Sequence, residues 1–129
     1  MEKSTKTGQI IIPAGRKPWP HELRVAEILA EAGHKVEFLP EANLKTADIL
    51  LDEVEFEIKS PKAALSNSLE HSLKKAIKQS PNIIVDISRI KHARANNVRR
   101  FLLAQANVRT GIKRLIMITG SGCIIDIFP

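Results

Sequence analysis

Residues 47–59 constrain the fold most, because two short apolar-periodic segments flank an acidic turn in this stretch. Side chains of an extended strand point alternately to opposite faces of a sheet. The apolar members of the second segment then face the core together: Val54, Phe56 and Ile58. Its charged members share the opposite face: Glu55, Glu57 and Lys59. The stretch therefore predicts an antiparallel hairpin with one apolar and one charged face.

The charged face of this hairpin forms a compact cluster with Asp48, at the start of the first strand. Such carboxylates can hold a divalent metal ion, and an adjacent ammonium group can stabilise the charge of a phosphate. The alternative is an exposed face with alternating charges, which is common on antiparallel sheets. On spacing alone the second interpretation is favoured, because an Asp followed later by Glu-x-Lys is a loose pattern.

The rest of the chain alternates apolar segments with breaks at proline and glycine. Residues 1–9 are predicted to be a mobile tail, and residues 10–129 a single domain. We expect helices over residues 21–32, 66–79 and 94–108. Residues 10–12 are expected to be a short apolar contact segment, and further strands are expected over residues 35–39, 82–87, 112–119 and 123–128. This order predicts an α/β fold: one domain of three layers, with a mixed β-sheet flanked by helices.

Composition favours a nucleic-acid partner without establishing one. The chain has 129 residues, enough for one domain with a core, and 43% of them are hydrophobic, which argues against disorder. The net charge of +6 favours a polyanion, and nucleic acid comes first. The low aromatic content of 4%, with no tyrosine, disfavours binding by stacked bases.

The single cysteine and the absence of long apolar runs limit the remaining classes. Cys123 cannot form an intramolecular disulfide and is predicted to be a small buried hydrophobe. No run approaches transmembrane length, and residues 1–8 lack the apolar core of a signal peptide. The sequence therefore predicts no membrane span.

The helix predicted over residues 21–32 contains one unusually placed acid. At 100° per residue, Glu22 falls in line with Ala26 and Leu29 on the apolar face. The polar side chains of the opposite face are predicted to be solvated: Arg24, Glu27 and Glu31. An acid in the first turn is stabilised by the helix dipole, but Glu22 can equally point into the sheet. Helix geometry leaves both explanations open.

Basic residues gather in two segments. Within residues 66–79 they recur at helical spacing and form a basic ridge: His71, Lys74, Lys75 and Lys78. A second group follows within residues 89–100. A solvated lysine face is the more frequent outcome of such ridges, but two basic segments beside an acidic cluster would let phosphates approach. The candidate nucleic-acid contacts are Lys62, Lys74, Lys75, Lys78, Arg89, Lys91 and Arg94.

These residues together resemble the C-terminal tRNase toxin domain of contact-dependent growth inhibition (CdiA-type) proteins, a variant of the PD-(D/E)xK nuclease fold. The similar segments are residues 20–40, 46–48, 57–61 and 79–86, within a similarity that runs from about Pro18 to Phe128. The resemblance implies a ribonuclease that cuts tRNA. It assigns the catalytic roles to Glu22, Asp48, Glu57 and Lys59.

The chemistry expected from this resemblance is metal-assisted. Asp48 and Glu57, with Glu22, are expected to bind a divalent cation, Mg²⁺ foremost, which polarises a phosphoryl oxygen and activates a bound water. Lys59 is expected to stabilise the additional negative charge of the transition state. On RNA a metal-free route stays open, in which the adjacent 2′-hydroxyl attacks and a carboxylate is the base.

Two other functions also stay open: a DNA endonuclease on the same core, and a non-catalytic nucleic-acid-binding module with a solvated acidic hairpin. The resemblance implies an immunity protein as a further partner. It places the domain at the end of a large secreted toxin or, for a free-standing chain, in the cytoplasm of a producing or target bacterial cell.

Overall fold

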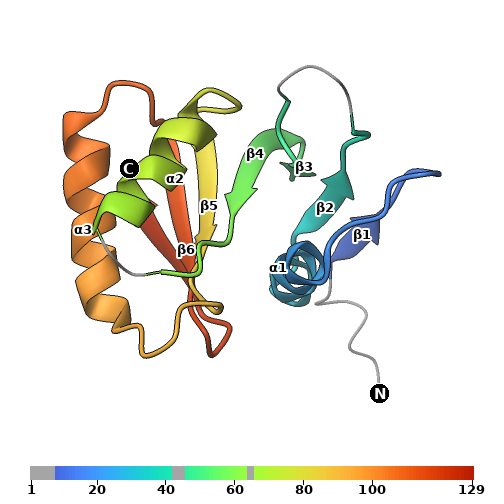
Figure 1. The fold of residues 1–129 in the computed structure, drawn as a ribbon. Coiled ribbons are helices and arrows are strands. Elements are labelled where there is room, and N and C mark those ends of the chain that lie inside the picture. The colour runs from blue at the N-terminus through green and yellow to red at the C-terminus, as the bar shows by residue number, and fades with distance from the viewer. Residues whose placement is uncertain (1–7, 42–45, 64–65) are drawn as a thin grey trace.

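The computed structural model describes residues 8–41, 46–63 and 66–129, which form three helices and one seven-stranded sheet (Figure 1). The helices are α1 (Pro20–Glu31), α2 (Ser66–Ile77) and α3 (Ala95–Val108). The strands are β1 (Gln9–Ile11), β2 (Lys35–Phe38), β3 (Ile49–Leu51), β4 (Val54–Lys59), β5 (Asn82–Asp86), β6 (Arg114–Ile118) and β7 (Ile124–Phe128).

Every predicted helix and strand is present, close to its expected bounds, and β1 is an additional strand that was not predicted from the sequence. The predicted tail is partly wrong, because Gln9 begins β1 and pairs with Lys35. The remainder of that prediction, residues 1–7, lies outside the described residues.

The strands follow one another across the sheet in chain order. β2, β3 and β4 pair antiparallel, as do β6 and β7. The neighbours β1–β2, β4–β5 and β5–β6 are parallel, so each pair needs a crossover connection. α1, α2 and α3 supply these crossovers. The predicted mixed sheet is confirmed.

Two hydrophobic cores lie on opposite faces of the sheet. α1 packs over one face, and α2 and α3 cover the other (Figure 1). β5 contributes to both cores, because Ile83 and Val85 face α2 and α3 whereas Ile84 faces α1. Continuous apolar runs of this kind are typical of parallel strands that are covered on both sides. The domain therefore has the three layers that the sequence predicts.

The predicted burial of the three apolar side chains of β4 is right for two of them and wrong for the third. Phe56 and Ile58 enter the core under α1, as expected. Val54 is 38% exposed instead, because it directly follows the exposed turn of the hairpin. On the other face α2 packs against β4, and Glu57 is only 2% exposed while Glu55 is exposed. The solvated-face interpretation therefore holds for Glu55 and is wrong for Glu57.

Arg24 is another residue whose predicted solvation is wrong. Its Nη1 lies 3.2 Å from Asp86 Oδ1, and its Nη2 donates to the carbonyl oxygens of Thr119 and Gly120. Asp86 ends β5, is fully buried and also accepts a hydrogen bond from Ser60 Oγ. Arg24 therefore joins α1 to the ends of β5 and β6. Helical periodicity could not show this, because the partners lie at least 62 residues away in sequence.

Replacing Arg24 should be costly for stability. We expect Arg24→Ala to lower the free energy of unfolding by about 2–4 kcal/mol, because it leaves the buried Asp86 without its cation. Urea denaturation of the variant measures the loss. Glu31→Ala, an exposed change on the same helix, should stay within about 0.5 kcal/mol of the wild type. Equal stability of the two variants would contradict a stabilising role for this ion pair.

The turn before β7 leaves Cys123 exposed, so the prediction of a buried cysteine is wrong. The reason is local, since β7 begins only at Ile124, one residue later. Among the helices that the structure describes, none combines the length and the apolarity needed to cross a bilayer.

Candidate active site

Asp48 lies beside Glu57 because of the hairpin register. Ile49 stands opposite Phe56, and one further step along the same pairing puts Asp48 opposite Glu57. The Asp48 N–H donates to the Phe56 carbonyl at 3.1 Å, and Asp48 Oδ2 accepts the N–H of Ile58 at 2.9 Å. These two hydrogen bonds fix the Asp48 carboxylate against β4.

Glu57 is a buried carboxylate that is only half satisfied. Its Oε2 lies 3.0 Å from Lys59 Nζ, while its buried Oε1 accepts no hydrogen bond from the described residues. Burial and then the charge of Asp48 raise the pKa of Glu57 to about 8, against the opposing effect of Lys59. At neutral pH Glu57 therefore keeps a proton, which it can donate to Asp48. A buried acid with a strongly raised pKa beside a second carboxylate is typical of catalytic centres.

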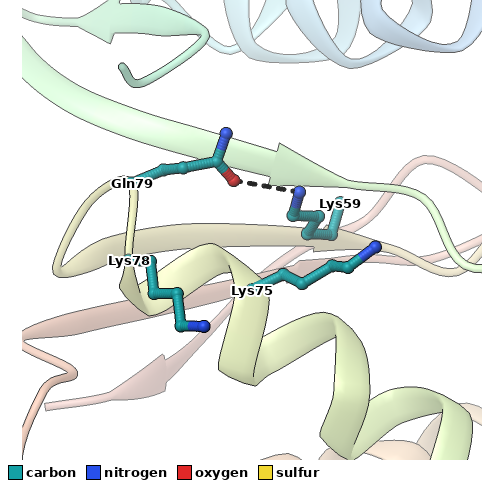
Figure 2. Close-up of a pocket in the computed structure, with 4 residues that line it drawn as sticks. All are labelled: Lys59, Lys75, Lys78 and Gln79. Carbon is teal, nitrogen blue, oxygen red and sulfur yellow. Dashed lines mark hydrogen bonds between the residues drawn. The ribbon is translucent and has the colours of Figure 1, made fainter. Parts of the chain in front are cut away.

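Lys59 connects the two carboxylates to an open pocket between β4 and α2. Its Nζ donates to Gln79 Oε1 at 3.1 Å in addition to contacting Glu57 (Figure 2). The pocket has a volume of about 340 Å³ and is lined by Lys59, Lys75, Lys78 and Gln79. Gln79 is not among the site residues predicted from the sequence. The one sequence feature that could have indicated Gln79 is its position directly before the Ser80–Pro81 break, where the chain turns from α2 towards β5.

Glu22 is buried, as its position on the apolar face of α1 predicts. Its Oε1 accepts the Trp19 N–H at 2.9 Å and lies 3.6 Å from Arg16 Nη2. Arg16 is itself buried, donates from Nε to the Leu39 carbonyl and lies over the ring of Phe38. Both explanations left open by helix geometry therefore apply, since Glu22 caps the first turn of α1 and also points inward.

The expected set of three metal-binding carboxylates is not gathered in the structure. Within residues 8–41, 46–63 and 66–129, no group of three His, Cys, Asp or Glu side chains is placed to hold a metal ion. Asp48 and Glu57 do lie together, whereas the described partners of Glu22 are Arg16 and Trp19. Two carboxylates, one with a free oxygen, fit Mg²⁺, which commonly binds one or two carboxylates plus waters and substrate phosphates.

The predicted nucleic-acid contacts fall into two groups. The exposed lysines of α2 and of the turn that follows it form the first: Lys74, Lys75 and Lys78. The second group lies in the segments that follow β4 and β5, and all its members are exposed: Lys62, Arg89, Lys91 and Arg94. Because β4 and β5 are parallel, these segments leave the sheet at the same edge. Of all seven residues, only Lys75 and Lys78 line the pocket beside Lys59.

The raised pKa of Glu57 should make stability depend on pH. An unfolded glutamate ionises near pH 4.5, so the folded protein binds one more proton than the unfolded chain between about pH 4.5 and 8. Stability present below this window is therefore lost as the pH rises through it. We therefore expect the stability of Glu57→Gln relative to the wild type to be higher at pH 8.5 than at pH 5, by roughly 1–3 kcal/mol. The difference should be smaller than the free energy that corresponds to the full pKa shift, because Lys59 and solvent share the charge.

Urea denaturation at the two pH values measures this effect. Glu55→Gln, an exposed change two residues away on the same strand, serves as the control and should show no such dependence. If the difference in free energy of unfolding between Glu57→Gln and the wild type does not change with pH, Glu57 does not ionise in a buried position, and the prediction is contradicted.

Comparison with known proteins agrees with the fold. Residues 45–124, which include Asp48, Glu57 and Lys59, match the family described as the contact-dependent growth inhibition CdiA C-terminal domain. A solved structure of a CdiA-CT/CdiI toxin and immunity complex from Burkholderia pseudomallei has the same fold. Its TM-score is 0.74 at 18% identity, over 95% of this chain and 100% of that chain. No curated protein matches the chain. Because the family match spans more than half of its residues, this protein belongs to the CdiA C-terminal domain family of contact-dependent growth inhibition.

Proposed function

We propose that this chain is an endoribonuclease toxin domain that cleaves phosphodiester bonds of tRNA at a centre formed by Asp48, Glu57 and Lys59. The observation that carries this proposal is Glu57, a buried carboxyl group between a second carboxylate and a lysine, whose Oε1 accepts no hydrogen bond from a described residue. Buried polar groups in folded proteins are almost always hydrogen-bonded, and the exceptions tend to serve catalysis or ion binding. A solvated hairpin face would not require this arrangement.

The charges around the centre support a nucleic-acid substrate. The net charge is +6, and a lysine-lined pocket adjoins Lys59. Cationic side chains that neutralise backbone phosphates supply most of the affinity for nucleic acids. The tRNA specificity rests on the resemblance to CdiA-type tRNase domains, and membership of the CdiA C-terminal family supports it.

Each residue of the centre has a distinct role in this proposal. Asp48 and Glu57, the latter after release of its proton, would hold Mg²⁺, which would supply polarisation of a phosphoryl oxygen and an activated water. Lys59 is held between Glu57 and Gln79, so its ammonium group is already oriented before substrate binds. It stabilises the charge that builds up on the phosphoryl oxygens in the transition state.

The same residues also support the metal-free route on RNA. Asp48 takes the proton of the 2′-hydroxyl, whose oxygen attacks phosphorus and forms a cyclic phosphate. The bond from phosphorus to the 5′-oxygen breaks, and Glu57 returns a proton to that oxygen. Lys59 has the same role in both routes. The burial that keeps a proton on Glu57 suits it to act as the acid.

Glu22 acts on the centre through positioning. Its carboxylate holds Arg16, and Arg16 donates to the carbonyl of Leu39. The Leu39 N–H in turn donates to the Asp48 carbonyl at 2.9 Å. Through these contacts Glu22 supports the segment that presents Asp48, while its own oxygens stay away from the reacting groups.

An immunity protein is the partner that this function requires inside a producing cell. The similar solved structure from Burkholderia pseudomallei is a complex of a toxin with its immunity protein. Co-expression of the chain with the protein encoded next to it, followed by affinity purification, tests whether the two form a stable complex.

The function is tested by incubating the protein with total tRNA and with plasmid DNA, each with Mg²⁺ or with a chelator. Cleavage of tRNA that the chelator abolishes supports the metal-assisted route, and cleavage that persists in chelator supports the metal-free route. Cleavage of DNA alone would replace the proposal by a DNA endonuclease. Intact tRNA and DNA under all conditions would contradict a nuclease.

A further inference from the structure

We propose that the pocket lined by Lys59, Lys75, Lys78 and Gln79 is a binding site for one backbone phosphate next to the phosphate that is cleaved. This inference rests on the proposed function and adds a second, non-reacting phosphate position to it. The pocket is open and has a volume of about 340 Å³, which accommodates a phosphate with part of its sugar. Its lining comes from β4, from α2 and from the turn that follows α2 (Figure 2).

The lining has an excess of positive charge. Of its three ammonium groups, only that of Lys59 has an acidic partner within 4.0 Å among the described residues, namely Glu57. Lys75 lies in the last turn of α2 and Lys78 in the turn that follows it, and neither has an ion pair with a described residue. Two cations held on one side of a pocket without a counter-charge favour an anionic ligand.

Gln79 adds a neutral donor to this site. A lysine ammonium group can only donate, so the Gln79 oxygen must face Lys59, and the amide NH₂ is left to donate to a ligand. The turn that carries Gln79 is anchored to β4, because Ser80 Oγ and Asn82 Nδ2 both donate to the Glu55 carbonyl. The donor is therefore presented by a fixed segment, as recognition of phosphate oxygens requires.

Lys59 is shared by the pocket and the catalytic carboxylates. It contacts Glu57 on one side and Gln79 on the other. A phosphate in the pocket would thus lie one nucleotide along the RNA strand from the phosphate at Asp48 and Glu57. Its role is to fix the register of the RNA strand, so that the next phosphodiester bond meets the reacting groups.

Neighbouring lysines of α2 provide a matched comparison. Lys74 and Lys75 are consecutive, equally charged and both exposed, but only Lys75 lines the pocket. Nuclear magnetic resonance titration with inorganic phosphate, at constant ionic strength in chloride, reports binding without any cleavage. We expect saturable shifts confined to Lys59 and residues 75–79. Lys75→Ala and Lys78→Ala should each weaken binding roughly tenfold, while Lys74→Ala should match the wild type.

The proposal would be overturned if Lys74→Ala weakened phosphate binding as much as Lys75→Ala does. Chemical-shift changes spread over all lysines would overturn it as well. Gln79→Ala should also weaken binding, and Gln79→Glu should abolish it by adding a negative charge. The two proposals fail separately: phosphate bound in the pocket without tRNA cleavage contradicts only the proposed function. Conversely, tRNA cleavage that Lys75→Ala lowers no more than Lys113→Ala, an exposed change outside the pocket and outside the candidate contacts, contradicts only the phosphate site.

Discussion

Glu57→Gln is expected to lower the rate of tRNA cleavage by about 10²–10⁴-fold, the usual contribution of a catalytic acid or base. Glutamine has the same shape, and its amide oxygen can keep the contact with Lys59. It cannot, however, exchange a proton at neutral pH or offer a charged oxygen to a cation. Cleavage rates at saturating enzyme, measured on total tRNA, isolate the chemical step from binding.

The control for this variant is Glu55→Gln. Glu55 and Glu57 share a strand and its charged face in the sequence pattern, but Glu55 is exposed and Glu57 is buried. Glu55→Gln should therefore cleave at the wild-type rate. A similar loss in both variants would indicate a general effect of charge on RNA binding and would contradict a catalytic role specific to Glu57.

Lys59→Ala is expected to lower the cleavage rate by about 10²–10³-fold, because it removes a positioned donor from the transition state. It should also raise the pKa of Glu57 further, since Lys59 is the group that holds this pKa down. The pH dependence of the remaining activity should therefore move to higher pH. Rates measured between pH 6 and 9 test both effects together.

Lys59→Arg should recover only part of the rate, because a planar guanidinium cannot reproduce the contacts of a compact ammonium group with Glu57 and Gln79. Lys62→Ala, an exposed change three residues further on, provides the comparison. It should weaken tRNA binding without changing the rate at saturation. A full rate in Lys59→Ala would show that Lys59 is a structural ion-pair partner only.

The local pattern of the sequence predicts the secondary structure well, because it depends on short-range chemistry. Gly33, with a φ of 101°, follows α1 where the predicted helix ends. Alternation also predicts that Phe56 and Ile58 face the core. The hairpin turn is less obvious, since Asp52 and Glu53 both adopt positive φ values, which glycine and asparagine favour.

The features that local patterns miss all depend on packing between distant segments. Glu57 is buried where α2 packs against β4, and Arg24 is only partly exposed because it pairs with Asp86 at the end of β5. Glu22 shows the same limit, because its partner Arg16 belongs to a proline- and glycine-rich loop without periodicity. The acidic residues of the site can therefore be named from sequence, whereas their burial and partners require the fold.

The family resemblance and the structure contribute different parts of the site. The resemblance selects Glu22, Asp48, Glu57 and Lys59 from many charged residues. The structure groups the last three and adds Gln79, which holds Lys59 in place. Neither spacing nor composition distinguishes Gln79 from an ordinary polar residue at a helix end.

The most direct test of a catalytic Glu57 is a comparison of tRNA binding and cleavage by the wild-type and Glu57→Gln proteins in the same samples. We predict that both proteins bind total tRNA with similar affinity in the presence of Mg²⁺, and that only the wild type converts it to fragments. Equal binding with no fragments from either protein would indicate a non-catalytic binding module. Equal cleavage by both proteins would place the active site elsewhere in the chain.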